Sequence, residues 1–203
     1  MKKIGLMGGT FDPIHYGHLV LAEQIRTRFN LDKVYFIPVG IPPHKQGKKI
    51  TSSKHRYFMT LLATITNPYF EISKIEIEDD GISYTVNTIK KFKETVDYNA
   101  ELYFITGADA IYELESWKNV KELLGLCNFI AASRPGIDED KLKSKIKDLK
   151  EKYNGNIILT SVPALAISST DIRNRVKKGE SIKYITPESV EYYIYKNSLY
   201  LEE

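Results

Sequence analysis

Two hydrophobic patterns alternate along the chain. Short segments that are either continuously apolar or apolar at every second position are typical of strands, and they lie at residues 4–7, 33–39, 70–77, 100–106, 127–133 and 156–162. Segments with apolar residues every three or four positions are typical of helices, and they lie at 19–29, 54–65, 83–96, 138–153 and 187–200. A further helix is predicted after Ser168 and Ser169, which can cap it, with Gly179 just past its end. Strands that alternate with helices predict an α/β fold: a Rossmann-like, doubly wound parallel sheet with helices on both faces.

Glycines and polar residues follow several of the predicted strands. They lie at residues 8–18, 42–45, 107–109, 134 and 168–173. Because the carboxyl ends of parallel strands meet at one edge of a sheet, and ligands of such sheets bind there, we expect these segments to converge on one site.

The junction after the first strand has the features of a phosphate site. Gly8 and Gly9 interrupt the apolar run and would let an anion approach the backbone, and a helical pattern begins soon afterwards. The first N–H groups of a helix lack internal partners and attract anions. His15 and His18 are three positions apart and can face the same side of that helix. A cap or a packing role is the alternative for either histidine, and the pair favours a phosphate site with two nitrogen donors.

Length and composition restrict the class of protein. A chain of 203 residues with 42% hydrophobic and 27% charged residues can form one domain, residues 1–203, around a sizeable core. The net charge of +3 is close to balanced and gives no support for a nucleic-acid partner. Cys127 is the only cysteine, which excludes an internal disulfide. The chain shows neither a signal peptide nor an apolar stretch long enough for a membrane helix, so we expect a cytoplasmic protein without a membrane partner.

Two motifs carry a resemblance to a known family. The segment GGTFDPIHYGHL at residues 8–19 resembles the first signature of the nucleotidyltransferases with an HxGH motif, and ISSTDIR at 167–173 resembles their second signature. Within that superfamily, the chain is most similar to the bacterial nicotinate mononucleotide adenylyltransferases, over essentially its whole length. The resemblance implies a fold of the nucleotidyltransferase type. It also implies an enzyme of NAD biosynthesis that transfers the adenylyl group of ATP to nicotinate mononucleotide, giving deamido-NAD and pyrophosphate.

The resemblance also assigns the residues of the ATP site. They are Gly8, Gly9, Thr10, Phe11, His15, His18, Gly107, Asp109, Ile167, Ser168, Ser169 and Arg173. Nucleotidyl transfer needs positioning and charge neutralisation rather than a protein nucleophile. His15 and His18 are therefore the expected catalytic donors to the α- and β-phosphate oxygens, and Arg173 would bind the leaving pyrophosphate through its planar fork. The alternative for 168–173 is an ordinary capped helix with a surface arginine, and Asp109 would suit a helix cap as well as a nucleotide contact.

The same resemblance places the acceptor, nicotinate mononucleotide. The residues implied are His44, Lys45, Ser83, Tyr84, Thr85, Trp117 and Arg134. Trp117 would stack on the pyridine ring and backbone amides near Thr85 would receive its carboxylate, although the only tryptophan of the chain could also be a packing residue. Lys118 departs from the family, in which an aromatic residue or a histidine is common at this position.

A magnesium ion is expected from the charge of the triphosphate, held mainly by the ATP phosphates. No metal site of the protein itself is expected, because His44, His55 and Cys127 do not have zinc-binding spacing.

Two other functions stay open at this point. One is another adenylyltransferase of the superfamily, such as phosphopantetheine adenylyltransferase, in which threonine usually replaces the residue at position 15. The other is a nucleotide-binding module without catalysis. The oligomeric state, including a homo-oligomer, is also open.

Overall fold

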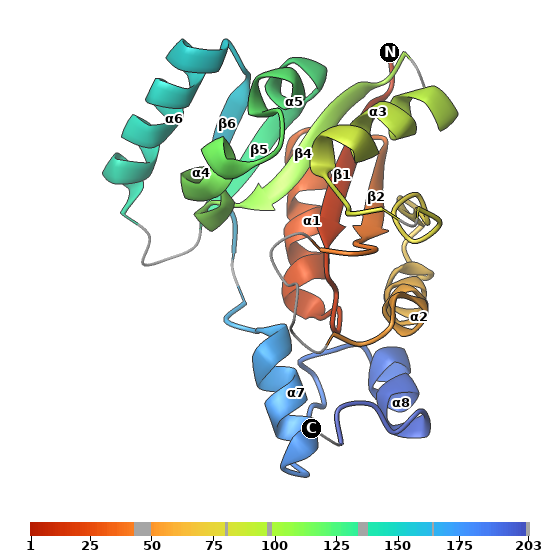
Figure 1. Ribbon diagram of the computed structural model, residues 1–203. Helices are drawn as coiled ribbons and strands as arrows, with labels where there is room; N and C mark the ends of the chain where they lie inside the picture. Colours follow the sequence, from red (N-terminus) through yellow and green to blue (C-terminus); the bar gives the residue numbers. More distant parts are fainter. Residues whose placement is uncertain (43–49, 80, 97–98, 134–137, 164, 202–203) are drawn as a thin grey trace.

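A single parallel sheet organises the computed structural model, which describes residues 1–42, 50–79, 81–96, 99–133, 138–163 and 165–201. Within these residues six strands pair in the order β3-β2-β1-β4-β5-β6 (Figure 1). Every pair is parallel. The strands are β1 (Lys3–Gly9), β2 (Lys33–Pro38), β3 (Phe70–Ile72), β4 (Glu101–Gly107), β5 (Asn128–Ser133) and β6 (Ile157–Ser161). The strand order reverses between β1 and β4, so the doubly wound fold is confirmed.

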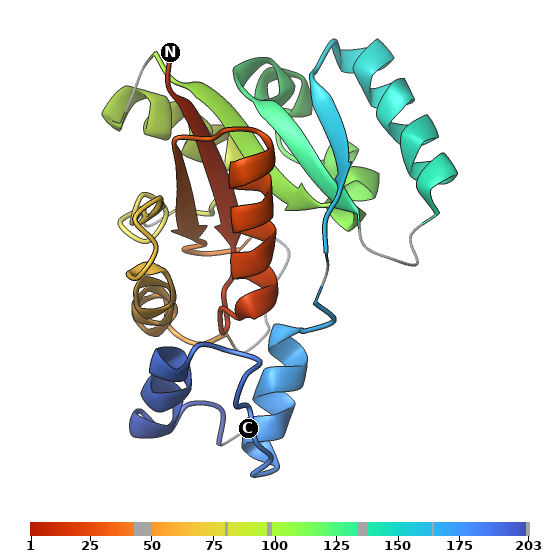
Figure 2. The same cartoon turned by 180° about the vertical axis from the view of Figure 1, so that it is seen from behind.

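Helices cover both faces of this sheet. α1 (Tyr16–Arg28) lies on one face (Figure 2), and α2 (Ser53–Thr64) packs against β2 and β3. The other face carries α3 (Thr85–Thr95), α4 (Asp109–Glu113), the 3₁₀ helix η2 (Leu114–Ser116), α5 (Val120–Leu126) and α6 (Glu139–Tyr153) (Figure 1). Beyond the carboxyl ends of the strands lie α7 (Ser169–Lys177) and α8 (Glu188–Lys196). In the described part of the chain, no helix has the length and apolarity needed to span a membrane.

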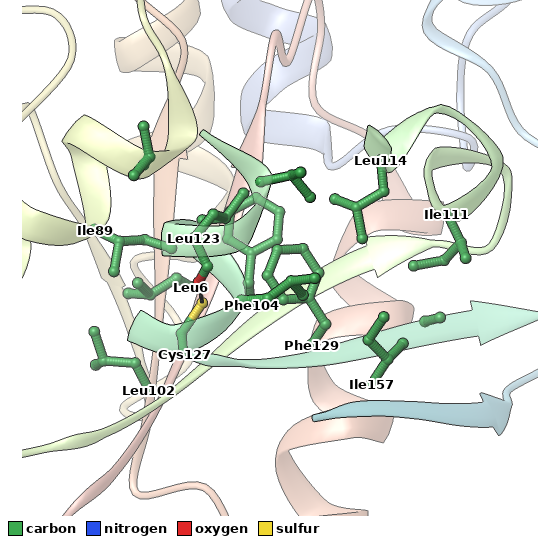
Figure 3. Close-up of a cluster of buried hydrophobic side chains, with 14 of the residues drawn as sticks. Leu6, Ile89, Leu102, Phe104, Ile111, Leu114, Leu123, Cys127, Phe129 and Ile157 are labelled. Carbon is green, nitrogen blue, oxygen red and sulfur yellow. Dashed lines mark hydrogen bonds between the residues drawn. The ribbon is translucent and has the colours of Figure 1, made fainter. Parts of the chain in front are cut away.

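The alternation of side chains along the central strands divides the core in two. In β4, Leu102 and Phe104 belong to the cluster under α3, α5 and α6, whereas Tyr103 and Ile105 belong to the cluster under α1, α7 and α8. Figure 3 shows Phe104 in the first cluster with Leu123. Gly5 of β1 lies where a Cβ atom would meet the Ile105 side chain at 3.0 Å. The strands are therefore buried on both faces, as their continuous apolar runs predict.

The structure corrects several boundaries. The strand expected at 70–77 ends at Ile72, and the Lys74 carbonyl then accepts hydrogen bonds from the N–H groups of Ile77 and Glu78, at 2.8 and 2.9 Å. The alternating pattern was misleading because Ile75 and Glu76 are buried in this turn rather than in the sheet. The terminal helix expected at 187–200 ends at Lys196. The helices between residues 109 and 126 were not predicted as separate elements.

Candidate active site

Two cavities meet at the carboxyl ends of β1 and β4. We call the larger one, of about 400 Å³, the histidine cavity, because His15 and His18 line it. We call the other one, of about 300 Å³, the tryptophan cavity, because Trp117 lines it. Gly8 of β1 and Thr106 of β4 line both of them. The two cavities therefore join at the point where the strand order reverses, which is the ligand-binding position of doubly wound sheets.

The two histidines form a stacked pair at the start of α1. Their ring centroids are 3.8 Å apart and the rings are inclined by 27°. His15 is the N-cap residue of α1, and its backbone N–H donates to Nδ1 of His18 at 3.2 Å. Gly17 lies against the pair, since a Cβ atom there would be 2.9 Å from Nδ1 of His15. The sequence HYGH therefore needs its glycine to keep the two rings together.

Burial keeps both imidazoles neutral at pH 7. It lowers the pKa of His15 to about 4, and burial together with the neighbouring His15 lowers the pKa of His18 to about 3. Because Nδ1 of His18 accepts a hydrogen bond, the proton of its neutral ring is on Nε2. The Nδ1 atom of His15 is buried and has no hydrogen-bond partner among the described residues. The pair thus offers uncharged donor and acceptor nitrogens to a ligand in the histidine cavity.

The start of α7 forms the opposite wall of the histidine cavity. Ser168 caps this helix, and its Oγ accepts a hydrogen bond from the Asp171 N–H at 3.1 Å. Ser169 donates from Oγ to the Pro13 carbonyl at 2.8 Å, which attaches α7 to the loop before α1. Both serines line the cavity together with Ile167. Two helix N-termini, of α1 and α7, therefore border one cavity, an arrangement that favours an anionic ligand.

An aromatic wall and another helix N-terminus border the tryptophan cavity. Trp117 lies edge-on to Phe104, with ring centroids 5.9 Å apart. On the other side, α3 begins after Tyr84, its N-cap residue, which makes no side-chain cap hydrogen bond, and no acidic residue occupies the first turn. The first N–H groups of a helix, here those of Thr85 and Val86, have no intrahelical acceptor. The cavity therefore combines an aromatic face with backbone donors for an anionic group.

A buried polar network joins the loops around both cavities. The fully buried Arg56 of α2 donates from Nη1 to the Thr10 carbonyl at 2.8 Å and from Nη2 to the Gly40 carbonyl at 3.1 Å. The Gly40 N–H in turn donates to Oγ of Ser83 at 3.1 Å. Arg56 thus connects the loops after β1 and β2, and Ser83 connects the second loop to the start of α3.

Glu76 is the acidic member of this network, and it lines the tryptophan cavity. Its Oε1 accepts a hydrogen bond from the Thr88 hydroxyl at 2.6 Å, and its buried Oε2 has no partner among the described residues. Burial raises the pKa of Glu76, whereas the hydrogen bonds from Thr88 and Ser83 and the positive charge of Arg56 act in the opposite direction.

Comparison with known proteins agrees with this architecture. The profile of the cytidylyltransferase-like family matches residues 6–175. A protein of Thermoanaerobacter sp. (strain X514), named a probable nicotinate-nucleotide adenylyltransferase, is 55% identical over 99% of this chain and 95% of its own length. The chain belongs to the nicotinate-nucleotide adenylyltransferase family. A relative from Moorella thermoacetica with the same name is 54% identical over 98% of this chain and 91% of its own length.

Solved structures of the family have the same fold. The nicotinic acid mononucleotide adenylyltransferase of Plasmodium falciparum, complexed with NaAD, matches with a TM-score of 0.77 and 26% identity. The match covers 98% of both chains. The same enzyme complexed with APC matches with a TM-score of 0.76.

The structure brings most of the sequence-predicted residues into the two cavities. The histidine cavity is lined by Gly8, His15, His18, Gly107, Ile167, Ser168 and Ser169, all of which the family resemblance assigned to ATP. The tryptophan cavity is lined by Ser83, Tyr84, Thr85 and Trp117, which the resemblance assigned to the acceptor. Gly9 and Thr10, also assigned to ATP, line the tryptophan cavity instead. They lie beside the junction of the two cavities.

Three predicted nucleotide residues line neither cavity. Phe11 is buried, packs edge-on against His18 with centroids 5.1 Å apart, and so supports the histidine rather than lining the cavity. Asp109 is exposed in the first turn of α4. Arg173 donates from Nη1 to the Asp12 carbonyl at 2.7 Å and lines a smaller cavity beside Asp12 and Tyr200. His44, Lys45 and Arg134 lie outside the described residues.

Sequence reasoning missed the residues that hold the site together. Arg56, Glu76 and Thr106 belong to no motif, and each looks in the sequence like an ordinary helix, surface or strand residue. Tyr200 had no role assigned from the sequence, yet its hydroxyl donates to Oδ1 of Asp12 at 2.7 Å. The sequence carries no signal for these contacts, because they join residues that lie far apart in the chain.

Proposed function

We propose that this protein transfers the adenylyl group of ATP to nicotinate mononucleotide and releases deamido-NAD and pyrophosphate. The observation that carries the proposal is the pair of cavities that join at Gly8 and Thr106, one suited to a triphosphate and the other to an aromatic acid. The family relatives are named for this activity, and the Plasmodium enzyme was solved complexed with NaAD. One catalytic domain, residues 1–203, would hold both substrates.

ATP would occupy the histidine cavity. Its phosphates would lie near the N-termini of α1 and α7, where free N–H groups and the helix dipoles stabilise negative charge. His18 would donate from Nε2 to a phosphate oxygen, and the rigid stacking against His15 would hold that donor in place. Because the donor is oriented before the reaction, it stabilises the charge that develops at the α-phosphate without reorganisation.

Nicotinate mononucleotide would occupy the tryptophan cavity. Its pyridine ring would stack on Trp117, and its ring carboxylate would accept hydrogen bonds from the N–H groups at the start of α3. Its phosphate would then point to Gly9 and Thr10, at the junction with the histidine cavity. This placement brings the two reacting phosphates together.

The reaction follows from this arrangement. An oxygen of the acceptor phosphate attacks the α-phosphorus of ATP, a new P–O bond forms, and the bond to the β-phosphate oxygen breaks. Pyrophosphate leaves with the electron pair of that bond. The protein contributes positioning and donors, because the acceptor phosphate is itself the nucleophile and no covalent intermediate with the protein is needed.

Magnesium would arrive with ATP. The described residues that line the histidine cavity offer imidazole, hydroxyl and backbone groups but no carboxylate, and no cluster of three or more ligating side chains occurs in the described part of the chain. Because Mg²⁺ prefers oxygen ligands, the phosphates would hold it and His15 and His18 would remain free to bind phosphate oxygens. When bound, the ion would neutralise charge on the triphosphate.

The direct test measures pyrophosphate release from MgATP with three separate acceptors: nicotinate mononucleotide, nicotinamide mononucleotide and phosphopantetheine. Release mainly with the nicotinate compound is the expected result. Release mainly with phosphopantetheine would favour the related adenylyltransferase, and ATP binding without release would favour a nucleotide-binding module. A Trp117→Ala variant provides the matched control, since it removes the aromatic wall and leaves the histidine cavity unchanged.

A further inference from the structure

Lys118 lies at the rim of the tryptophan cavity. It follows Trp117 directly, and its Nζ is 4.2 Å from the centroid of the Tyr84 ring, a cation–π contact. It also lines an adjoining cavity of about 260 Å³, which shares Glu76, Ser83 and Tyr84 with the tryptophan cavity. The ammonium group therefore stands beside the residue that precedes α3.

The positive charge of Lys118 is available to a ligand. In the described part of the chain no ion pair joins its Nζ to a carboxylate, and two acids of this region pair with other lysines. Glu122 contacts Lys90 at 2.6 Å, and Asp79 contacts Lys91 at 3.6 Å. An anion entering the tryptophan cavity thus meets, at its mouth, a cation that has no ion-pair partner among the described residues.

We propose that Lys118 strengthens the preference of this site for an acidic acceptor, by pairing its ammonium with the ring carboxylate of nicotinate mononucleotide. The inference deepens the proposed function and rests on it. It concerns discrimination between the acid and the corresponding amide, nicotinamide mononucleotide, rather than the transfer step.

The N–H donors at the start of α3 discriminate only in part. The helix dipole there favours a carboxylate, but the same donors can also bind the carbonyl oxygen of an amide. The full positive charge of Lys118 distinguishes the acid from the amide, because only the acid carries a negative charge that it attracts.

The rim position limits the size of the effect. Lys118 is exposed, and exposed charge pairs contribute modestly and are screened by salt. Once a stacked pyridine ring covers one side of the cavity, the ion pair between Lys118 and the ring carboxylate is partly desolvated and therefore stronger. We expect Lys118 to account for about a three- to tenfold preference for the acid.

The test compares Lys118→Gln, Lys118→Arg and a control, Lys121→Gln, which removes an exposed lysine of α5 that lines neither cavity. For each variant, kcat/KM is measured with both mononucleotides at low and high salt. Lys118→Gln should lower the acid-to-amide ratio about three- to tenfold through the KM of the acid, less so at high salt, with kcat and the KM of ATP unchanged. Lys118→Arg and Lys121→Gln should keep the wild-type ratio.

Two outcomes would overturn the inference: an unchanged ratio in Lys118→Gln, or an equal loss with both acceptors, which would indicate a packing role on Tyr84. Failure of the proposed function is recognised separately, because the wild-type protein would then release no pyrophosphate with either mononucleotide. In that case calorimetric titration of the protein with each of the two mononucleotides still tests the role of Lys118. Tighter binding of the acid that Lys118→Gln abolishes would support the role of Lys118, and equal or absent binding would refute it.

Discussion

Acidification from pH 7 to pH 5 should destabilise this protein strongly, because the stacked histidines cannot be protonated easily in the folded state. Burial lowers the pKa of His15 to about 4 and that of His18 to about 3, whereas the same groups in the unfolded chain titrate near their ordinary value of 6.5. Below pH 6.5 the unfolded chain therefore binds more protons than the native protein. The free energy of unfolding falls as the pH falls through this range.

The size of this effect follows from the two shifts. Each histidine lowers the free energy of unfolding by up to about 1.4 kcal/mol for each pH unit below 6.5. Between pH 7 and pH 5 this amounts to somewhat less than 2 kcal/mol for a buried imidazole. His15 is buried and His18 is half-buried, so we expect about 3 kcal/mol for the pair. Burial raises the pKa of Glu76, so this carboxyl acts in the opposite direction and favours the folded state as the pH falls.

The assay is urea unfolding at constant ionic strength, followed by the fluorescence of Trp117, the only tryptophan. The double variant His15→Asn/His18→Asn retains an acceptor near the position of Nδ1 of His18 but cannot be protonated, and it should lose most of the decrease between pH 7 and pH 5. The control is His55→Asn, which removes a histidine that contacts Tyr193 outside the cavities. A double variant with the wild-type pH dependence would refute the reasoning.

Three substitutions test the assigned roles. His18→Ala should reduce turnover more than about a hundredfold while far-ultraviolet circular dichroism stays unchanged, because a preorganised donor to the phosphates is lost; near-full turnover would contradict that role. Trp117→Ala should raise the KM of the mononucleotide and leave that of ATP nearly unchanged, as steady-state kinetics can show; equal effects on both would move Trp117 out of the acceptor site. Arg56→Lys keeps the charge but cannot bind the Thr10 and Gly40 carbonyls together, and urea unfolding should show a loss of about 2 kcal/mol; an unchanged stability would argue against the bridging role.

Local pattern was sufficient for the framework of the fold. The central strands are buried on both faces, so their apolar runs are continuous and easy to recognise, and the helices carry one apolar stripe each. The pattern failed at residues 70–77, where Glu76 and Ile75 alternate like strand residues but lie in a turn. The hydrophobic pattern indicates which residues are buried, but it does not indicate whether they are buried in a sheet or in a turn.

The catalytic motifs were equally accessible, because their chemistry is local. Gly8, His15 and His18 lie within one turn and one helix start, so their spacing alone predicts a phosphate site. Arg56 and Glu76 carry no such signal. Their roles come from contacts with Thr10, Gly40 and Thr88, which belong to other elements.

The sequence by itself determined the α/β class, the phosphate-binding turn with its two histidines, and the second motif that caps α7. Only the tertiary structure decided that the site has two cavities, that they join at Gly8 and Thr106, and that Lys118 lies at one rim against the Tyr84 ring. The physical reason is that a strand, a turn or a helix start depends on residues close together in the chain. A cavity is enclosed by segments that only the order of the strands brings together.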